Sequence, residues 1–163
     1  MTAPESPRGG ASGVGPGAAV AFATIAFATL VIFGFGMLSL ALGEDVIEVR
    51  GLGAVPGILG LVAGTVVFGL CLLSVLRRPA PSFWSVLWIT AAVFLAYLLA
   101  LWIGTLGAGA GIAAATSIIG RIATTWFGAI VAGAAAISAW GGVALVRTRA
   151  GRPRWPWERD EDQ

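Results

Sequence analysis

The chain has 163 residues, of which 58% are apolar and 11% are charged, and its formal net charge is +2. This composition is typical of an integral membrane protein and argues against a soluble globular domain. The sequence contains one Cys and no His, which excludes a His metal site, an intramolecular disulfide and a CxxC redox pair.

The apolar residues fall into four long runs without Asp, Glu, Lys, Arg or His. The runs cover about residues 18–42, 54–76, 83–106 and 122–146. A helix of about 20 residues crosses roughly 30 Å of hydrocarbon and satisfies its own backbone hydrogen bonds there. We therefore predict an all-α polytopic membrane protein whose four transmembrane helices form an up-down antiparallel bundle.

Residues 1–17 precede the first run and are rich in Pro, Gly and Ser, so we predict a disordered tail there. Near the end of the first run, Ser39-Leu40-Ala41 resembles a signal-peptide cleavage site. The run is longer than the 7–15 apolar residues that are usual in a signal peptide. A first span that stays in the chain is the favoured interpretation, and a cleaved signal peptide is the alternative.

Three carboxylates, Glu44, Asp45 and Glu48, lie together in the loop after the first run. Hard divalent cations bind oxygen ligands, so the cluster is a conceivable cation site. It lacks the regular spacing and the glycine of a calcium loop, and such clusters are more often solvated. We therefore predict no metal site, and we expect no cofactor and no nucleic-acid partner.

Small residues line one face of the second run and one face of the fourth. In lipid, helices approach closely where side chains are small. At the 4-3-4-3 spacing of a left-handed seam, the second run continues through Val67, Cys71 and Ser74. The predicted packing seams consist of Gly53, Gly57, Gly60 and Gly64, and of Gly128, Ala132, Ala135, Ala139 and Gly142.

These seams leave three alternatives open. They meet each other across the diagonal of the bundle, or one of them binds a second copy or another membrane protein, or the stripes arise by chance in runs so rich in Ala and Gly. On the opposite face of the fourth run, a bulky stripe that includes Trp126 and Trp140 is expected to meet lipid or to fill a wider crevice.

Cys71 and Tyr97 are the only titratable side chains within the four runs. A thiol in hydrocarbon stays protonated, so Cys71 is expected to pack as a small apolar residue. The Tyr97 hydroxyl is expected to find a hydrogen-bond partner on a neighbouring helix.

Six tryptophans have the positions of interfacial anchors, because indole rings favour the boundary between lipid and water. They are Trp84, Trp88, Trp102, Trp126, Trp155 and Trp157.

Arg121 is the only charged residue between Arg78 and Arg147. The preceding segment, GAGAGIAAATSIIG, is too apolar for a solvated loop, and we predict a helix that begins near Ile118 and continues directly into the fourth span. In a continuous helix, the 26 residues from Arg121 to Arg147 cover about 39 Å, which places Arg121 at the outer interface.

Continuing the small seam of the fourth run back by 4-3 steps gives Thr125 and then Arg121. We predict an outer clamp in which Arg121 pairs with the loop of Glu44, Asp45 and Glu48. Simple snorkelling of Arg121 to the interface is the alternative. No catalytic role is expected for this residue.

The arginines predict the orientation, because an excess of basic residues marks the cytoplasmic side of a membrane protein. Only Arg50 and Arg121 lie on the other side. The cytoplasmic set is Arg8, Arg77, Arg78, Arg147, Arg149, Arg152, Arg154 and Arg159. Both termini are therefore predicted to be cytoplasmic. The tail 147–163 anchors at the membrane through Arg and Trp, or binds anionic lipid or a cytoplasmic partner.

All basic residues are Arg, and Lys, His and Asn are absent while Ala and Gly abound. In composition and layout the chain resembles the small uncharacterised four-span membrane proteins of actinobacteria. The resemblance covers the whole chain but has no diagnostic motif, so it implies no functional residues.

Membrane exporters with a buried Glu, intramembrane proteases and lipid phosphotransferases need carboxylates, or a Ser–His pair, within the spans. The four runs have neither. We therefore expect a non-catalytic accessory or scaffold protein that associates with itself or with other membrane proteins through small-residue helix faces. The alternative is an oligomeric channel or transporter for a small or hydrophobic solute.

Overall fold

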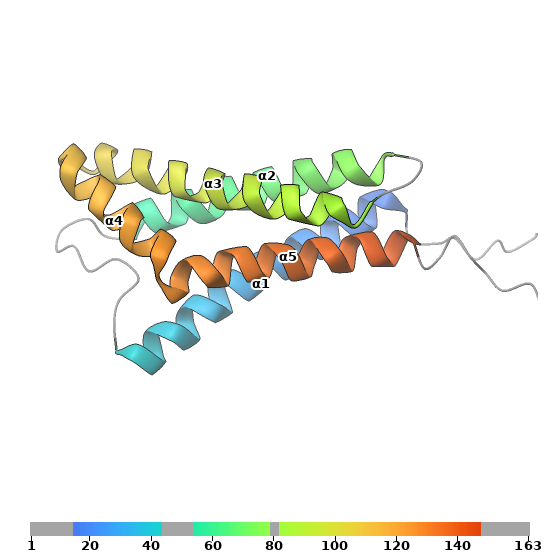
Figure 1. Ribbon diagram of the computed structural model, residues 1–163, viewed down its shortest axis with the longest axis horizontal. Coiled ribbons are helices and arrows are strands. Elements are labelled where there is room, and N and C mark those ends of the chain that lie inside the picture. The colour runs from blue at the N-terminus through green and yellow to red at the C-terminus, as the bar shows by residue number, and fades with distance from the viewer. Residues whose placement is uncertain (1–14, 44–53, 79–81, 148–163) are drawn as a thin grey trace, which may run out of the picture.

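Figure 1 shows the computed structural model, which describes residues 15–43, 54–78 and 82–147. Five helices make up nearly all of this described part: α1 (Pro16–Leu42), α2 (Val55–Leu76), α3 (Trp84–Gly107), α4 (Ile112–Thr124) and α5 (Trp126–Arg147). Four of them, α1, α2, α3 and α5, are long and apolar enough to cross a membrane. The all-α class with four such helices is confirmed, and α4 is a shorter fifth helix.

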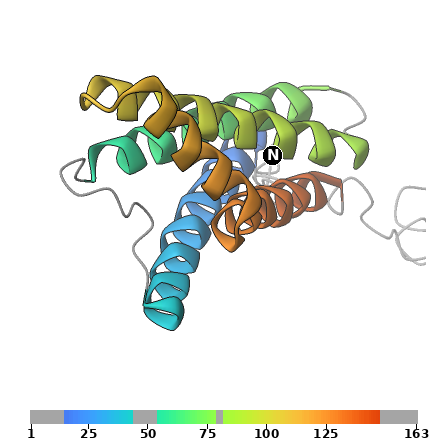
Figure 2. The same cartoon turned by 60° about the vertical axis from the view of Figure 1, so that its left-hand side comes forward.

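The four long helices alternate in direction, so one end of the bundle carries Arg77, Arg78 and Arg147 (Figure 1). We call this the basic end and the opposite one the far end. The largest interfaces join α2 to α3 and α1 to α5, and α5 also packs on α3. Toward the far end, α1 diverges from the α2–α3 pair, as Figures 1 and 2 both show.

The buried faces of α1, α2 and α3 repeat every four residues. On α2 this face consists of Pro56, Gly60, Gly64, Phe68, Leu72 and Leu76. The predicted 4-3-4-3 seam is therefore wrong beyond Gly64, because Phe68 and Leu72 take the buried positions and Ser74 is exposed. A four-residue repeat corresponds to packing of i±4 ridges, for which helices cross at about −40 to −50°.

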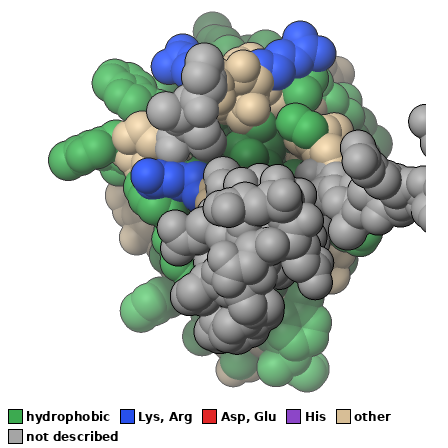
Figure 3. Space-filling model, turned by 90° about the vertical axis from the view of Figure 1, so that its right-hand side faces the viewer, with side chains coloured by type: hydrophobic (Ala, Val, Ile, Leu, Met, Phe, Trp, Pro, Cys, Tyr) green, Lys and Arg blue, Asp and Glu red, His purple; other side chains and the backbone are tan. Residues whose placement is uncertain are grey.

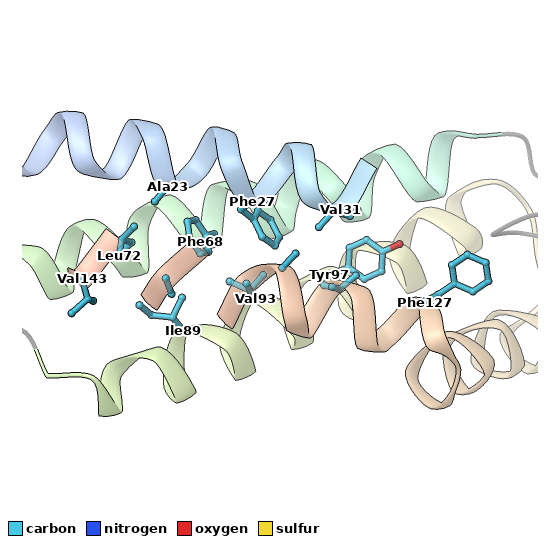
Figure 4. Close-up of a cluster of buried hydrophobic side chains, with 14 of the residues drawn as sticks. Ala23, Phe27, Val31, Phe68, Leu72, Ile89, Val93, Tyr97, Phe127 and Val143 are labelled. Atoms are coloured by element: carbon cyan, nitrogen blue, oxygen red, sulfur yellow. The ribbon is translucent and has the colours of Figure 1, made fainter. Parts of the chain in front are cut away.

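The axis of the bundle is filled by large apolar side chains (Figure 4). The rings of Phe27 on α1 and Phe68 on α2 stack with centroids 4.9 Å apart. Tyr97 of α3 is only 1% exposed and lies against Gly60 of α2, where an added Cβ would come 2.9 Å from its ring. The absence of a side chain at Gly60 is what admits the Tyr97 ring to the centre.

Tyr97 begins a chain of aromatic contacts that reaches the remaining helices. Its ring meets Phe35 of α1 edge to face at 6.2 Å between centroids, and Phe35 meets Phe127 of α5 at 5.6 Å. Edge-to-face pairs at such distances are stabilising. All four long helices are therefore linked through Gly60, Tyr97, Phe35 and Phe127.

A tight turn at the far end connects α3 to α4. The N–H of Gly109 donates to the carbonyl of Leu106 at 3.0 Å, and the N–H of Ala110 donates to that of Thr105 at 3.1 Å. With Gly109 at φ 88°, these two bonds form a Schellman motif, which ends a helix in a left-handed residue that suits glycine. The turn sends α4 obliquely from the far tip of α3 toward the start of α5 (Figure 1).

Helix α4 ends and α5 begins around one residue, Thr125, whose backbone is extended at φ −102° and ψ 175°. Its N–H donates to the carbonyl of Arg121 at 3.0 Å, and its own carbonyl accepts the N–H of Gly128 at 3.1 Å. The prediction of a helix that runs directly from about Ile118 into the fourth span is therefore wrong. The helix begins earlier, at Ile112, and breaks at Thr125.

Gly128 makes this elbow possible. A Cβ at this position would lie 2.5 Å from the Ile122 carbonyl oxygen and 3.1 Å from that of Ala123, and backbone atoms cannot give way as a side chain can. We expect Gly128→Ala to lower the free energy of unfolding by about 1–3 kcal/mol, as overpacking does elsewhere. Titration of the detergent-solubilised protein with a denaturing detergent measures this loss.

Gly133 on the same helix provides the matched control, since an added Cβ there meets nothing within 4 Å. Gly133→Ala is expected to leave the stability unchanged or to raise it by up to about 1 kcal/mol through helix propensity. Equal losses for the two variants would contradict the account of the elbow.

Candidate functional site

The buried Tyr97 hydroxyl is the first candidate for a functional group inside the bundle. In Figure 4 its oxygen points toward the side on which Phe127 lies. Among the described residues no group hydrogen-bonds this buried oxygen, nor those of Thr24, Thr90 and Ser138. The expected partner for Tyr97 on a neighbouring helix is therefore not found there.

Other hydroxyls bond to their own helix. Thr65 donates to the Leu61 carbonyl at 2.7 Å, and Ser74 donates to the Leu70 carbonyl at 2.8 Å. Thr105, which is fully buried, does the same with the Trp102 carbonyl at 2.8 Å. Such bonds use the donor of each hydroxyl within its own helix and leave its oxygen as an acceptor.

Arg121 lies half-buried in the last turn of α4, where a positive charge interacts favourably with the helix C-terminus. Because the helix breaks at Thr125, the 39 Å estimate for a continuous helix from Arg121 to Arg147 does not apply. The extension of the small seam through Thr125 to Arg121 is wrong for the same reason. Glu44, Asp45 and Glu48 lie outside the described residues, so the clamp stays a prediction.

The sequence interpretation missed the amphipathic character of α4. Its inward face carries Ala115, Ile118, Ile119 and Ile122, at the spacing of one helical face. Thr116, Ser117, Gly120 and Thr124 lie on the exposed face. This alternation was readable in the sequence and is typical of a helix at an interface rather than of the buried start of a span.

The seam residues occupy packed positions inside the chain. Gly60 and Gly64 are buried against α3, and a Cβ at Gly142 would lie 3.0 Å from Leu72 of α2 and 3.2 Å from Ala23 of α1. Gly128, Ala135 and Ala139 are also buried. Gly57 and Ala132 are half-buried, whereas Gly53 lies outside the described residues. Gly60 therefore faces α3, whereas Gly142 of the α5 seam faces both α1 and α2.

The tryptophans lie at two levels along the bundle. Trp84 and Trp88 are exposed at the basic end, and Trp126 is exposed at the start of α5. Trp102, nearer the far end of α3, is half-buried. Trp155 and Trp157 are outside the described residues. Trp140 is also exposed on α5.

Cys71 is half-buried on α2 and is a free thiol. Within the described ranges no group of three or more His, Cys, Asp or Glu side chains is placed to hold a metal ion. The described charged side chains are all arginines. The described residues therefore present guanidinium groups, which donate to anions, and hydroxyls, which donate or accept hydrogen bonds, rather than an acid–base pair.

The Tyr97 hydroxyl generates a prediction. A buried hydroxyl without a partner costs about 1–3 kcal/mol, whereas a phenyl ring in its place carries no such penalty. We expect Tyr97→Phe to leave the free energy of unfolding unchanged or to raise it, by about 1 kcal/mol. A clear loss of stability would mean that the hydroxyl has a partner. Thr105→Val, which removes a hydroxyl that is bonded, is the control and should destabilise the protein.

Over residues 17–163 the chain matches the family described as "Family of unknown function (DUF6121)", and it belongs to that family. No curated protein and no solved structure matches it.

Proposed function

We propose that this protein is a non-catalytic accessory or scaffold component of a membrane, which associates with itself or with another membrane protein. We further propose that it lies in the cytoplasmic membrane of a bacterium, of actinobacterial type, with both termini in the cytoplasm. This orientation is supported by the uneven distribution of arginines between the two sides of the four apolar runs. In Figure 3, which views the basic end, arginine side chains lie round its margin.

The filled axis of the bundle carries the proposal. The stacked rings of Phe27 and Phe68, with Tyr97 beyond them, occupy the space between the long helices. A conduction path needs polar groups or water along its length. Such packing within a single chain favours a role at the outer surface of the bundle over transport through its interior.

Small residues on one side of α5 remain available for a partner, since Ala129 is exposed and Gly133 and Ala136 are half-buried. Ala129, Gly133 and Ala136 lie between the exposed rings of Trp126 and Trp140. Ala129 and Gly133 have the small-xxx-small spacing at which transmembrane helices approach closely. The other small faces of α2 and α5 are used inside the chain, so we propose this one for association.

A bulky residue at Gly133 tests the proposal. A Cβ there meets nothing within 4 Å, so Gly133→Ile is expected to fold normally. It should abolish the co-purification of the stoichiometric partner, or of the second copy, that accompanies the wild-type protein from its native membrane in mild detergent. Quantitative mass spectrometry of the purified complex measures this.

Gly36 on α1 supplies the matched control, because it is exposed and an added Cβ there also meets nothing within 4 Å. Gly36→Ile should retain the partner. A wild-type protein that purifies alone as a monomer, or one that conducts a solute in proteoliposomes, would contradict the proposed role.

A further inference from the structure

A groove of about 560 Å³ lies between α2 and α3 at the basic end of the bundle. Its α2 side is formed by one helical stripe that runs from Leu70 to Arg78, the second residue after the helix. Its α3 side runs from Ser85 to Ala92. Eight residues of helix correspond to about 12 Å, so the groove is elongated along the bundle axis.

The lining of the groove is charged at one end and mainly apolar along the rest, where the hydroxyl of Ser74 donates to the Leu70 carbonyl of its own helix. Arg78 and Ser85 lie at the basic end, whereas Leu70 and Ala92 lie toward the middle of the spans. Ile89 is buried between them, and Trp88 stands at the side with 78% of its surface exposed. A charged end followed by an apolar channel has the polarity of a lipid molecule with its headgroup at the interface.

The Arg78 guanidinium is available, in contrast to that of Arg147. Arg147 lies over the Phe83 ring at 4.7 Å from its centroid, a cation–π contact. Arg78 is exposed, and its backbone N–H donates to the Val75 carbonyl at 3.1 Å. The described ranges contain no carboxylate that could neutralise it.

We propose that this groove binds an anionic phospholipid. The Arg78 guanidinium pairs with the phosphate, because its planar set of N–H donors matches phosphate oxygens. The Ser85 hydroxyl donates to the same headgroup, and the Trp88 indole lies at the level of the interface. One acyl chain follows the apolar part of the groove past Ile89 toward Leu70. Basic pockets between transmembrane helices bind anionic headgroups in this way.

The apolar length of the groove favours a lipid over free phosphate. A phosphate ion would contact only the end that holds Arg78 and Ser85, and the rest of the groove would contribute nothing to its binding. An acyl chain contacts that remainder and reaches it from the membrane without leaving the hydrocarbon.

The full chain in mild non-ionic detergent tests the site, with bound lipids counted by native mass spectrometry. We expect phosphatidylglycerol to bind the wild-type protein about tenfold more tightly than phosphatidylcholine, as one charge-assisted pair would give. Arg78→Gln should remove this preference. Arg77→Gln should keep it, since Arg77 is equally basic and exposed but does not line the groove.

A second variant tests the apolar part of the groove. Ala92→Phe fills it and leaves Arg78 in place, so it should also weaken phosphatidylglycerol binding, whereas inorganic phosphate at the same concentration should not displace the lipid. Equal losses in Arg77→Gln and Arg78→Gln would overturn the site in favour of general surface charge. Displacement by phosphate together with an unaffected Ala92→Phe variant would overturn the lipid as its occupant.

Discussion

The close approach of α2 to α3 at Gly60 is the contact on which the rest of the bundle depends. Without a side chain at Gly60, the Tyr97 ring lies at the centre of the structure and is 1% exposed. From there it touches Phe35 of α1, which in turn touches Phe127 at the start of α5. One missing side chain thus determines where three aromatic rings and four helices lie, because close-packed interiors transmit such displacements.

Two consequences follow for function. The first is that apolar side chains occupy the axis, which favours a function at the outer surface of the bundle over one in its interior. The second is that Phe127, the second residue of α5, is fixed next to the elbow at Thr125. The elbow separates the amphipathic α4 from the long apolar α5. The far end thus carries a helix suited to an interface, whereas the basic end carries Arg77, Arg78 and Arg147.

Much of the fold was predictable from the sequence, because long uncharged runs must be helices in lipid. Hydropathy does not determine which face of each helix is buried. Gly60 and Gly64 fit a 3.5-residue and a four-residue repeat equally well, and the choice depends on the large Tyr97 ring of the facing helix. The same limit applies to Arg77 and Arg78, of which only Arg78 lines the groove, because that depends on the rotation of α2.

The break at Thr125 was harder to predict, although two signals were present. The adjacent β-branched residues Thr124 and Thr125 lower helix propensity, and residues 112–124 have an amphipathic pattern that the following span lacks. Neither signal excludes a continuous helix. The need for glycine at position 128 becomes clear only when the carbonyls of Ile122 and Ala123 are in place.

A size exchange between Gly60 and Tyr97 tests the central contact most directly. Alone, Gly60→Leu should overpack the α2–α3 interface and Tyr97→Ala should leave a cavity, and each should destabilise the protein by about 1–5 kcal/mol. In the double variant the leucine occupies space that the ring leaves, so the combined loss should fall short of the sum by at least about 1 kcal/mol. Additive losses in the measured free energies of unfolding would contradict the contact.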